Sequence, residues 1–125
     1  MTYALWILRI GIFGTFLGHG VFALMKNPGW FPFLEFWGFS EPQINVLMPA
    51  IGVVDIGVAL SALFKPNKYV LLYAVTWAFL TALMRPITGG SWWDFVERAA
   101  NWAAPLALYF LYYRLETDAY FSRKV

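Results

Sequence analysis

The chain lacks cysteine altogether and has a single histidine, His19. The absence of cysteine excludes disulfides, thiol redox chemistry and Cys-ligated clusters or zinc sites. One histidine and few carboxylates argue against a metal site within one protomer. We therefore expect no metal site. The alternative is a haem that uses His19 as its one axial ligand.

Charged residues are also scarce. They make up 13% of the 125 residues, against about 25% in a typical soluble domain. Apolar residues make up 61% and aromatic residues 21%. The net charge of +2 is too small to indicate a nucleic-acid partner. The composition predicts an integral membrane protein in which residues 1–125 form one domain in contact with the lipid bilayer.

Four apolar stretches fill most of the chain, and each approaches the ~20 residues that a helix needs to cross a bilayer. They cover residues 4–25, 44–64, 69–87 and 97–113. This pattern predicts an all-α protein, an antiparallel bundle of four transmembrane helices. The first stretch is too long and too aromatic for a signal peptide, so we expect it to be retained. The short link at residues 65–68 predicts that the second and third helices are antiparallel neighbours.

Basic residues are distributed unequally between the two ends of this bundle. The end with both termini holds Lys65, Lys68, Arg114, Arg123 and Lys124. The other end holds Lys26, Arg85 and Arg98. Because cytoplasmic loops carry an excess of Lys and Arg, this distribution predicts that both termini are cytoplasmic.

The first loop is unusually aromatic between Trp30 and Phe39. Such a segment is expected at the membrane interface and not in water. Two interpretations are open. The segment is either an aromatic anchor in the interface or a lid over the outer mouth of the bundle.

Two charged residues lie well inside the predicted spans, Arg9 in the first and Asp55 in the second. An unpaired charge in hydrocarbon costs roughly 3 kcal/mol on insertion scales, so both should face inward and have partners. Small residues at Gly52, Ala59 and Ala62 share a helical face with Asp55, which indicates that this face meets another helix. We therefore predict a buried Arg9–Asp55 ion pair. The alternative is that Asp55 binds a ligand group or relays protons.

Other polar residues lie further toward the outer end of the bundle than Arg9 and Asp55. Trp77, Thr81 and Arg85 follow Tyr73 on one helical stripe, which suits either helix packing or the wall of a cavity for a flat apolar ligand. Arg98 is expected to pair with a carboxylate, Glu35 or Glu97. The sequence predicts an outer ligand pocket, unless these groups satisfy one another completely. Its predicted lining is His19, Asp55, Trp77, Thr81, Arg85, Glu97 and Asn101.

Glycines in the first helix suggest close helix packing. Gly14 and Gly18 form a G-x-x-x-G motif, and Gly11 lies on the same side. Such a face approaches another helix, either in the same chain or in a second protomer. With its large apolar perimeter, the chain is predicted to form a homo-oligomer.

Several segments together resemble one family. An Arg early in helix one followed by "GTFLGHGVFAL", the mid-helix acid in "IGVVDIGVALSALF", and "WWDFVERAANWAAPLAL" are similar to the DoxX-like family of small four-helix membrane proteins. The usual acid of that family in helix two is Glu, whereas this chain has Asp55. The resemblance implies a bacterial inner-membrane protein and an accessory subunit of a membrane oxidoreductase, such as a thiosulfate–quinone system. The lack of cysteine argues against the thiol chemistry of some relatives.

Four functional hypotheses follow. The first is a binding module for a quinone, isoprenoid or other lipid-like molecule that serves a redox partner, with quinone as the candidate cofactor. The second is an enzyme with Asp55, His19 or Glu97 as acid or base. The sequence has no nucleophile–base pair and no cofactor motif, so we expect no intrinsic catalytic activity. The others are a structural or assembly subunit, and a small transporter or proton path through Asp55.

Overall fold

The computed structural model describes residues 2–124, apart from the side chains of residues 114–117, 120 and 121. All regular elements in this range are helical, and no strand occurs in it, which confirms the predicted all-α class. The four long helices are α1 (Thr2–Leu24), α3 (Glu41–Phe64), α4 (Lys68–Ile87) and α6 (Ala99–Ser122). Short helices lie in the loop between α1 and α3 and in the loop between α4 and α6. They are η1 (Pro28–Trp30) and α2 (Phe31–Glu35) in the first loop and α5 (Trp92–Val96) in the second.

Three of the long helices, α1, α3 and α4, are long and apolar enough to cross a membrane. Within the described residues α6 does not meet the same requirement. Large apolar side chains cover the outside of the molecule; Ile7 is 68% exposed and Val53 is 64% exposed. A water-soluble monomer rarely exposes so extensive an apolar surface. The chain is therefore a membrane protein.

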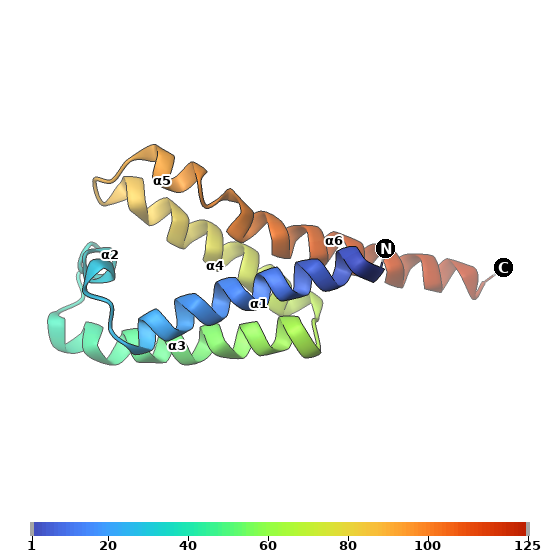
Figure 1. Cartoon of the computed structure of the whole chain (residues 1–125), viewed down its shortest axis with the longest axis horizontal. Helices are drawn as coiled ribbons and strands as arrows, with labels where there is room; N and C mark the ends of the chain where they lie inside the picture. Colours follow the sequence, from blue (N-terminus) through green and yellow to red (C-terminus); the bar gives the residue numbers. More distant parts are fainter. Residues whose placement is uncertain (1, 125) are drawn as a thin grey trace.

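The long helices associate in two pairs. α1 packs along α3, α4 packs along α6, and α1 also contacts α6. Both termini and the α3–α4 turn lie at one end of the molecule, here called the terminal end, and α2 and α5 lie at the opposite, distal end (Figure 1). The pairs converge at the terminal end and separate toward the distal end (Figure 1).

The α3–α4 turn joins two antiparallel helices that pack little against each other. α3 and α4 run antiparallel, but they make few contacts with each other. The turn at Pro66 joins their ends, whereas the small-residue face of α3 is turned toward α1. The two helices are antiparallel and joined at their ends, as predicted, but they do not pack against each other along their length. Their separation leaves room between the two helix pairs.

A buried apolar core holds the two pairs together in the terminal half. Alanines supply many of its contacts, and small side chains let neighbouring helices approach closely. The core consists of Ile12, Phe16, Val58, Ala59, Ala62, Leu71, Ala74, Ala78 and Leu108. Because these residues come from all four long helices, the terminal half is closed by side chains.

α1 and α3 remain in contact beyond this core because two glycines lie at their crossing. A Cβ atom on Gly52 would lie 2.7 Å from the carbonyl oxygen of Gly20. The predicted packing face is different: a Cβ atom on Gly11, Gly14 or Gly18 would meet nothing within 4 Å. The G-x-x-x-G face is therefore not used between helices of one chain.

Local hydrogen bonds define where the helices around the site begin. The Ser40 backbone N–H donates to Gln43 Oε1 at 2.9 Å, at the start of α3. The Val70 N–H donates to Asn67 Oδ1 at 3.0 Å, at the start of α4. After α4 the chain turns through Gly89, whose φ of 99° is one that glycine adopts without strain. These caps fix the register of the helices that carry the polar residues.

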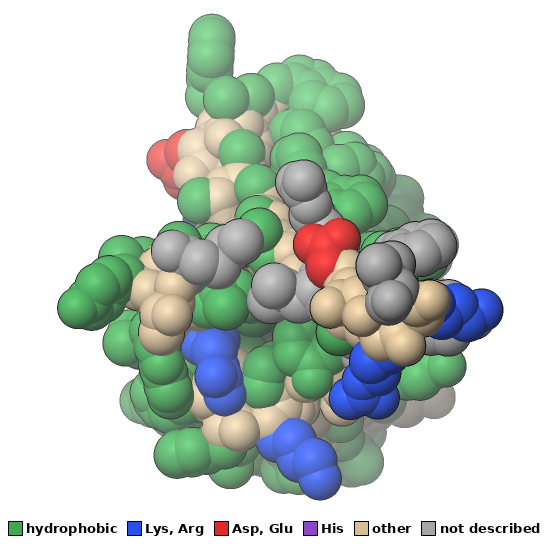
Figure 2. All heavy atoms as spheres, turned by 90° about the vertical axis from the view of Figure 1, so that its right-hand side faces the viewer, with side chains coloured by type: hydrophobic (Ala, Val, Ile, Leu, Met, Phe, Trp, Pro, Cys, Tyr) green, Lys and Arg blue, Asp and Glu red, His purple; other side chains and the backbone are tan. Residues whose placement is uncertain are grey.

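The terminal end carries exposed basic side chains. Lys65, Arg123 and Lys124 are exposed there, and Lys68 is half-buried. Figure 2 looks onto this end and shows Lys and Arg side chains with hydrophobic side chains around them. The side chain of Arg114, which the sequence analysis placed at the same end, lies outside the described residues.

Candidate functional site

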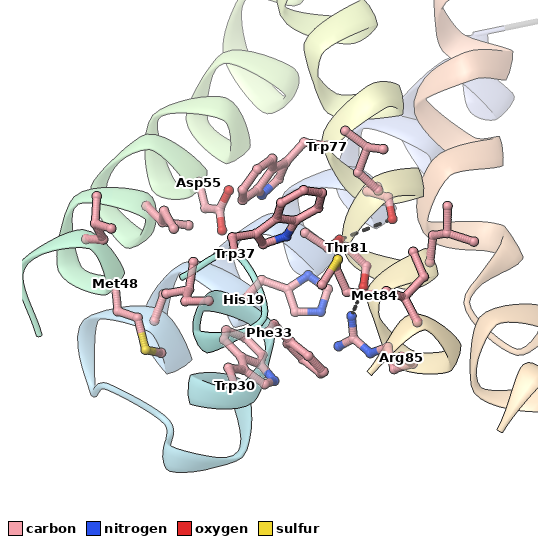
Figure 3. A pocket seen from close by; sticks show the side chains of 18 of the residues that line it. His19, Trp30, Phe33, Trp37, Met48, Asp55, Trp77, Thr81, Met84 and Arg85 are labelled. Atoms are coloured by element: carbon pink, nitrogen blue, oxygen red, sulfur yellow. Dashed lines mark hydrogen bonds between the residues drawn. The ribbon is translucent and has the colours of Figure 1, made fainter. Parts of the chain in front are cut away.

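A cavity of about 680 Å³ lies between the helix pairs in the distal half, the predicted outer half. Its walls come from α1, α3 and α4, and the η1–α2 segment covers it. Figure 3 shows Asp55 and Trp77 at one end of this space, Arg85, Phe33 and Trp30 at the other, and His19 and Trp37 between them. The volume falls within the roughly 300–1,000 Å³ of pockets that hold small molecules.

Five of the seven predicted pocket residues line this cavity. They are His19, Asp55, Trp77, Thr81 and Arg85. Tyr73, one turn before Trp77, stacks on it with ring centroids 6.3 Å apart but is not part of the lining. Most of the remaining lining is apolar, so the cavity presents a few polar groups in a hydrophobic wall.

Glu97 and Asn101 do not reach the cavity. The Glu97 side chain is 65% exposed and pairs with Arg98, with Oε1 2.8 Å from Nη1. This pair confirms the prediction that Arg98 has a carboxylate partner. Asn101 lies on α6, which packs against α4, and none of the described side chains of α6 lines the cavity. The prediction that these two residues line the pocket is therefore wrong.

Asp55 is the most unusual residue of the lining. It is only 3% exposed, yet its Oδ1 atom has no hydrogen-bonding partner among the described residues. The Trp77 indole lies near the carboxyl group (Figure 3). An unpartnered buried carboxyl oxygen is costly, roughly 1–3 kcal/mol and more for a charged group. A group from outside the chain that donates a hydrogen bond here would recover much of that cost.

The predicted Arg9–Asp55 ion pair is not formed. Arg9 Nε donates to the carbonyl oxygen of Ala62 at 3.3 Å, two helical turns from Asp55, and its guanidinium lies 4.4 Å from the Trp6 ring centre. The reason is directional, because side chains on a helix tilt toward its N-terminus. α1 and α3 are antiparallel, so Arg9 leans toward the terminal end and Asp55 toward the distal end.

Arg85 places a cation at the distal end of the cavity. Its Nη1 donates to the backbone oxygen of Thr81, one turn earlier in α4. The guanidinium carbon lies 5.0 Å from the centre of the Phe33 ring, which belongs to α2. No carboxylate in the described part of the chain forms an ion pair with it. Arg85 therefore keeps N–H donors that a ligand oxygen can accept from.

The η1–α2 segment rests on both helix pairs. Trp30 packs edge-to-face against His19 of α1, with ring centroids 5.7 Å apart, and against Phe22 at 6.0 Å. Phe33 meets Arg85 of α4. The segment therefore lies across the opening between α1 and α4, as the lid interpretation predicts.

Sequence reasoning missed the apolar part of the lining. Met48 and Ile51 contribute to it from α3, and they precede Asp55 by seven and four residues on the same helical face. Met84 lines the cavity from α4 and follows Thr81 by three residues on the same helical face. Extending the face of each polar residue toward the distal end would have identified them.

No family model, curated protein or solved structure matches the chain. Its function is therefore inferred from the chemistry of the cavity. Aromatic walls at Trp37 and Trp77 suit a flat apolar body. Asp55 offers an acceptor at one end, and Arg85 offers donors at the other. The arrangement is suited to holding a lipid-soluble molecule that carries oxygen atoms.

Proposed function

We propose that this chain is a DoxX-like integral membrane protein that binds a quinone- or lipid-like molecule in the distal cavity. In this proposal it serves a membrane redox system as an accessory or binding subunit. The observation that carries the proposal is the aromatic-lined cavity of about 680 Å³ with the unpartnered oxygen of buried Asp55 in its wall.

The exposure of the lining supports a ligand that comes from the bilayer. Leu80 and Ile87 line the cavity from α4 and are 48% and 42% exposed on the apolar outside of the molecule. Since α3 and α4 make few contacts, the side of the cavity between them is weakly closed. A lipid-soluble molecule would reach Asp55 from the membrane without crossing water.

Two alternative functions receive less support. A purely structural subunit would fill its distal half with side chains, whereas here the polar residues surround a cavity. A proton path through Asp55 would need polar groups that continue toward the terminal end. The core that closes that half is apolar and includes Phe16, Val58 and Ala78.

The membrane arrangement is part of the proposal. α6 is the fourth span of a bundle in the bacterial inner membrane, and both termini are cytoplasmic. The basic side chains at the terminal end support this orientation, because positive residues favour the cytoplasmic side (Figure 2).

Self-association through α1 is also part of the proposal. The open face at Gly11, Gly14 and Gly18 supports it, since small residues let a second protomer approach closely. Cross-linking in native membranes should give a species larger than the monomer, and a monomer alone would refute this part.

The binding proposal is tested by native mass spectrometry of the protein in mild detergent. The wild type should carry a co-purifying small molecule or retain an added short-chain quinone or isoprenoid. Ile51→Trp should abolish retention, because Ile51 lines the cavity. Val54→Trp is the matched control on the same helix; Val54 is 47% exposed and lies outside the lining. A wild-type protein that retains none of these molecules would refute the binding function.

A further inference from the structure

Asp55 limits which molecules the cavity can hold well. Asp55 is 3% exposed, and Oδ1 has no hydrogen-bonding partner among the described residues. Figure 3 shows the carboxyl group directed into the space between Trp77 and Trp37. A bound molecule that places a hydrogen-bonding atom against this carboxyl group would satisfy it.

The chemistry of the carboxyl group decides which atom fits. An ionised carboxylate only accepts hydrogen bonds, whereas a neutral carboxyl group also has an O–H that can donate. A ligand carbonyl against the ionised group would bring two acceptors together and leave both unpaired, so a carbonyl fits only the neutral acid. A ligand hydroxyl can donate a hydrogen bond or accept one, so it fits both forms of the acid.

We infer that the cavity selects the hydroxyl-bearing, reduced form of a flat lipid-soluble molecule, such as a hydroquinone, over the oxidised form that carries only carbonyl groups. In this arrangement the ligand O–H donates to Asp55 Oδ1, and the ring lies among the aromatic side chains of the cavity. The inference rests on the proposed binding function and specifies the ligand of that same site.

The distal end of the cavity does not reverse this preference. Arg85 has only N–H donors, which a hydroxyl oxygen and a carbonyl oxygen both accept. Thr81 is occupied within its own helix, because its hydroxyl donates to the Ala78 carbonyl oxygen at 3.1 Å. His19 can donate or accept, so it serves both forms equally. Discrimination between the forms therefore lies at Asp55.

The test compares three ligands on the wild-type protein in detergent under anaerobic conditions. They are a short-chain benzoquinone, its hydroquinone, and the dimethyl ether of that hydroquinone. Isothermal titration gives each dissociation constant. With Asp55 ionised, the hydroquinone should bind about tenfold or more tightly than the quinone, because only the hydroquinone can donate a hydrogen bond to the carboxylate. The dimethyl ether has the same ring but no O–H donor, so it should lose this advantage.

A substitution at Asp55 provides the second arm. Asp55→Asn introduces an amide N–H₂ that can donate to a ligand carbonyl, so the preference for the hydroquinone should fall to about threefold or less. Glu41→Gln is the matched control, because Glu41 is an exposed acid outside the cavity and should leave the preference unchanged. The wild-type comparison with the dimethyl ether decides the matter even if Asp55→Asn does not fold.

The possible results separate this inference from the proposed function. If the quinone and the hydroquinone bind equally, or the quinone binds more tightly, the preference is refuted while the binding function stands. A dimethyl ether that binds as well as the hydroquinone refutes it in the same way. If none of the three ligands binds, the quinone-type ligand and the preference both fail.

Discussion

Replacing Gly52 with alanine should force α1 and α3 apart at their crossing. The new Cβ atom would lie 2.7 Å from the carbonyl oxygen of Gly20 and 2.9 Å from the backbone nitrogen of Leu24. Ordinary van der Waals contact begins at 3.4 Å, and backbone atoms cannot rotate away as a flexible side chain can. The two helices must therefore separate by several tenths of an ångström.

The size of the effect follows from two opposing contributions. Overpacking a close contact costs about 1–3 kcal/mol. Alanine gains about 0.5–1 kcal/mol over glycine inside a helix. We therefore expect a net loss of roughly 0–2.5 kcal/mol, centred near 1 kcal/mol, in the free energy of unfolding for Gly52→Ala. Gly57→Ala is the control on the same helix, since its Cβ atom would meet nothing within 4 Å. It should stabilise the protein by about 0.5–1 kcal/mol.

The measurement is denaturant unfolding in mixed detergent micelles, with thermal unfolding as a second readout. Gly52→Ala should lower the midpoint and Gly57→Ala should raise it or leave it unchanged. If both substitutions raised the midpoint equally, α1 and α3 would not approach each other as closely as the structure indicates. The reasoning about their crossing would then be wrong.

Three further predictions concern the charges and the termini. Arg9→Ala and Asp55→Asn should have additive effects on stability within about 0.5 kcal/mol, because Arg9 bonds a main-chain carbonyl and not the acid. A larger coupling energy in a double-mutant cycle would show that the two residues interact. A single cysteine at Ala23, on the cavity wall, should react several-fold faster with a water-soluble maleimide after Arg85→Ala, which removes the cation under the lid. An unchanged rate would show that Arg85 does not hold the segment closed. A C-terminal phosphatase fusion should be inactive and a fluorescent fusion bright; the reverse would invert the proposed orientation.

The long helices were predictable because each apolar stretch is long and ends at turn-forming residues. The first three predicted stretches differ from α1, α3 and α4 by no more than about three residues at any boundary. Their pairing was not predictable in the same way. A short turn fixes which ends are close, but the packing partner depends on which faces carry small residues. Gly52 faces Gly20 of α1, and this contact takes α3 away from α4.

The sequence predicts how far along the bundle each polar residue of the site lies, but it predicts only partly which way each side chain points. Depth follows from counting residues along a helix, and it placed Asp55 near the centre and His19 and Arg85 further toward the distal end. Direction depends on how each helix is rotated against its neighbours. α6 lies behind α4, so Asn101 at a similar depth cannot reach the cavity. The tilt of side chains toward helix N-termini, which separates Arg9 from Asp55, acts only once the packing is known.

The unequal halves of the molecule have a consequence for its folding energetics. The terminal half contains the packed core, and the distal half is divided by the cavity, so local opening should be cheaper at the distal end. A molecule that binds only the folded state adds stability by mass action, about 2.7 kcal/mol at a hundred times its dissociation constant. A molecule bound in the cavity would fill the interior of the distal half, as side chains fill the interior of the terminal half. The stability of the protein would then report how much of that molecule the surrounding membrane contains.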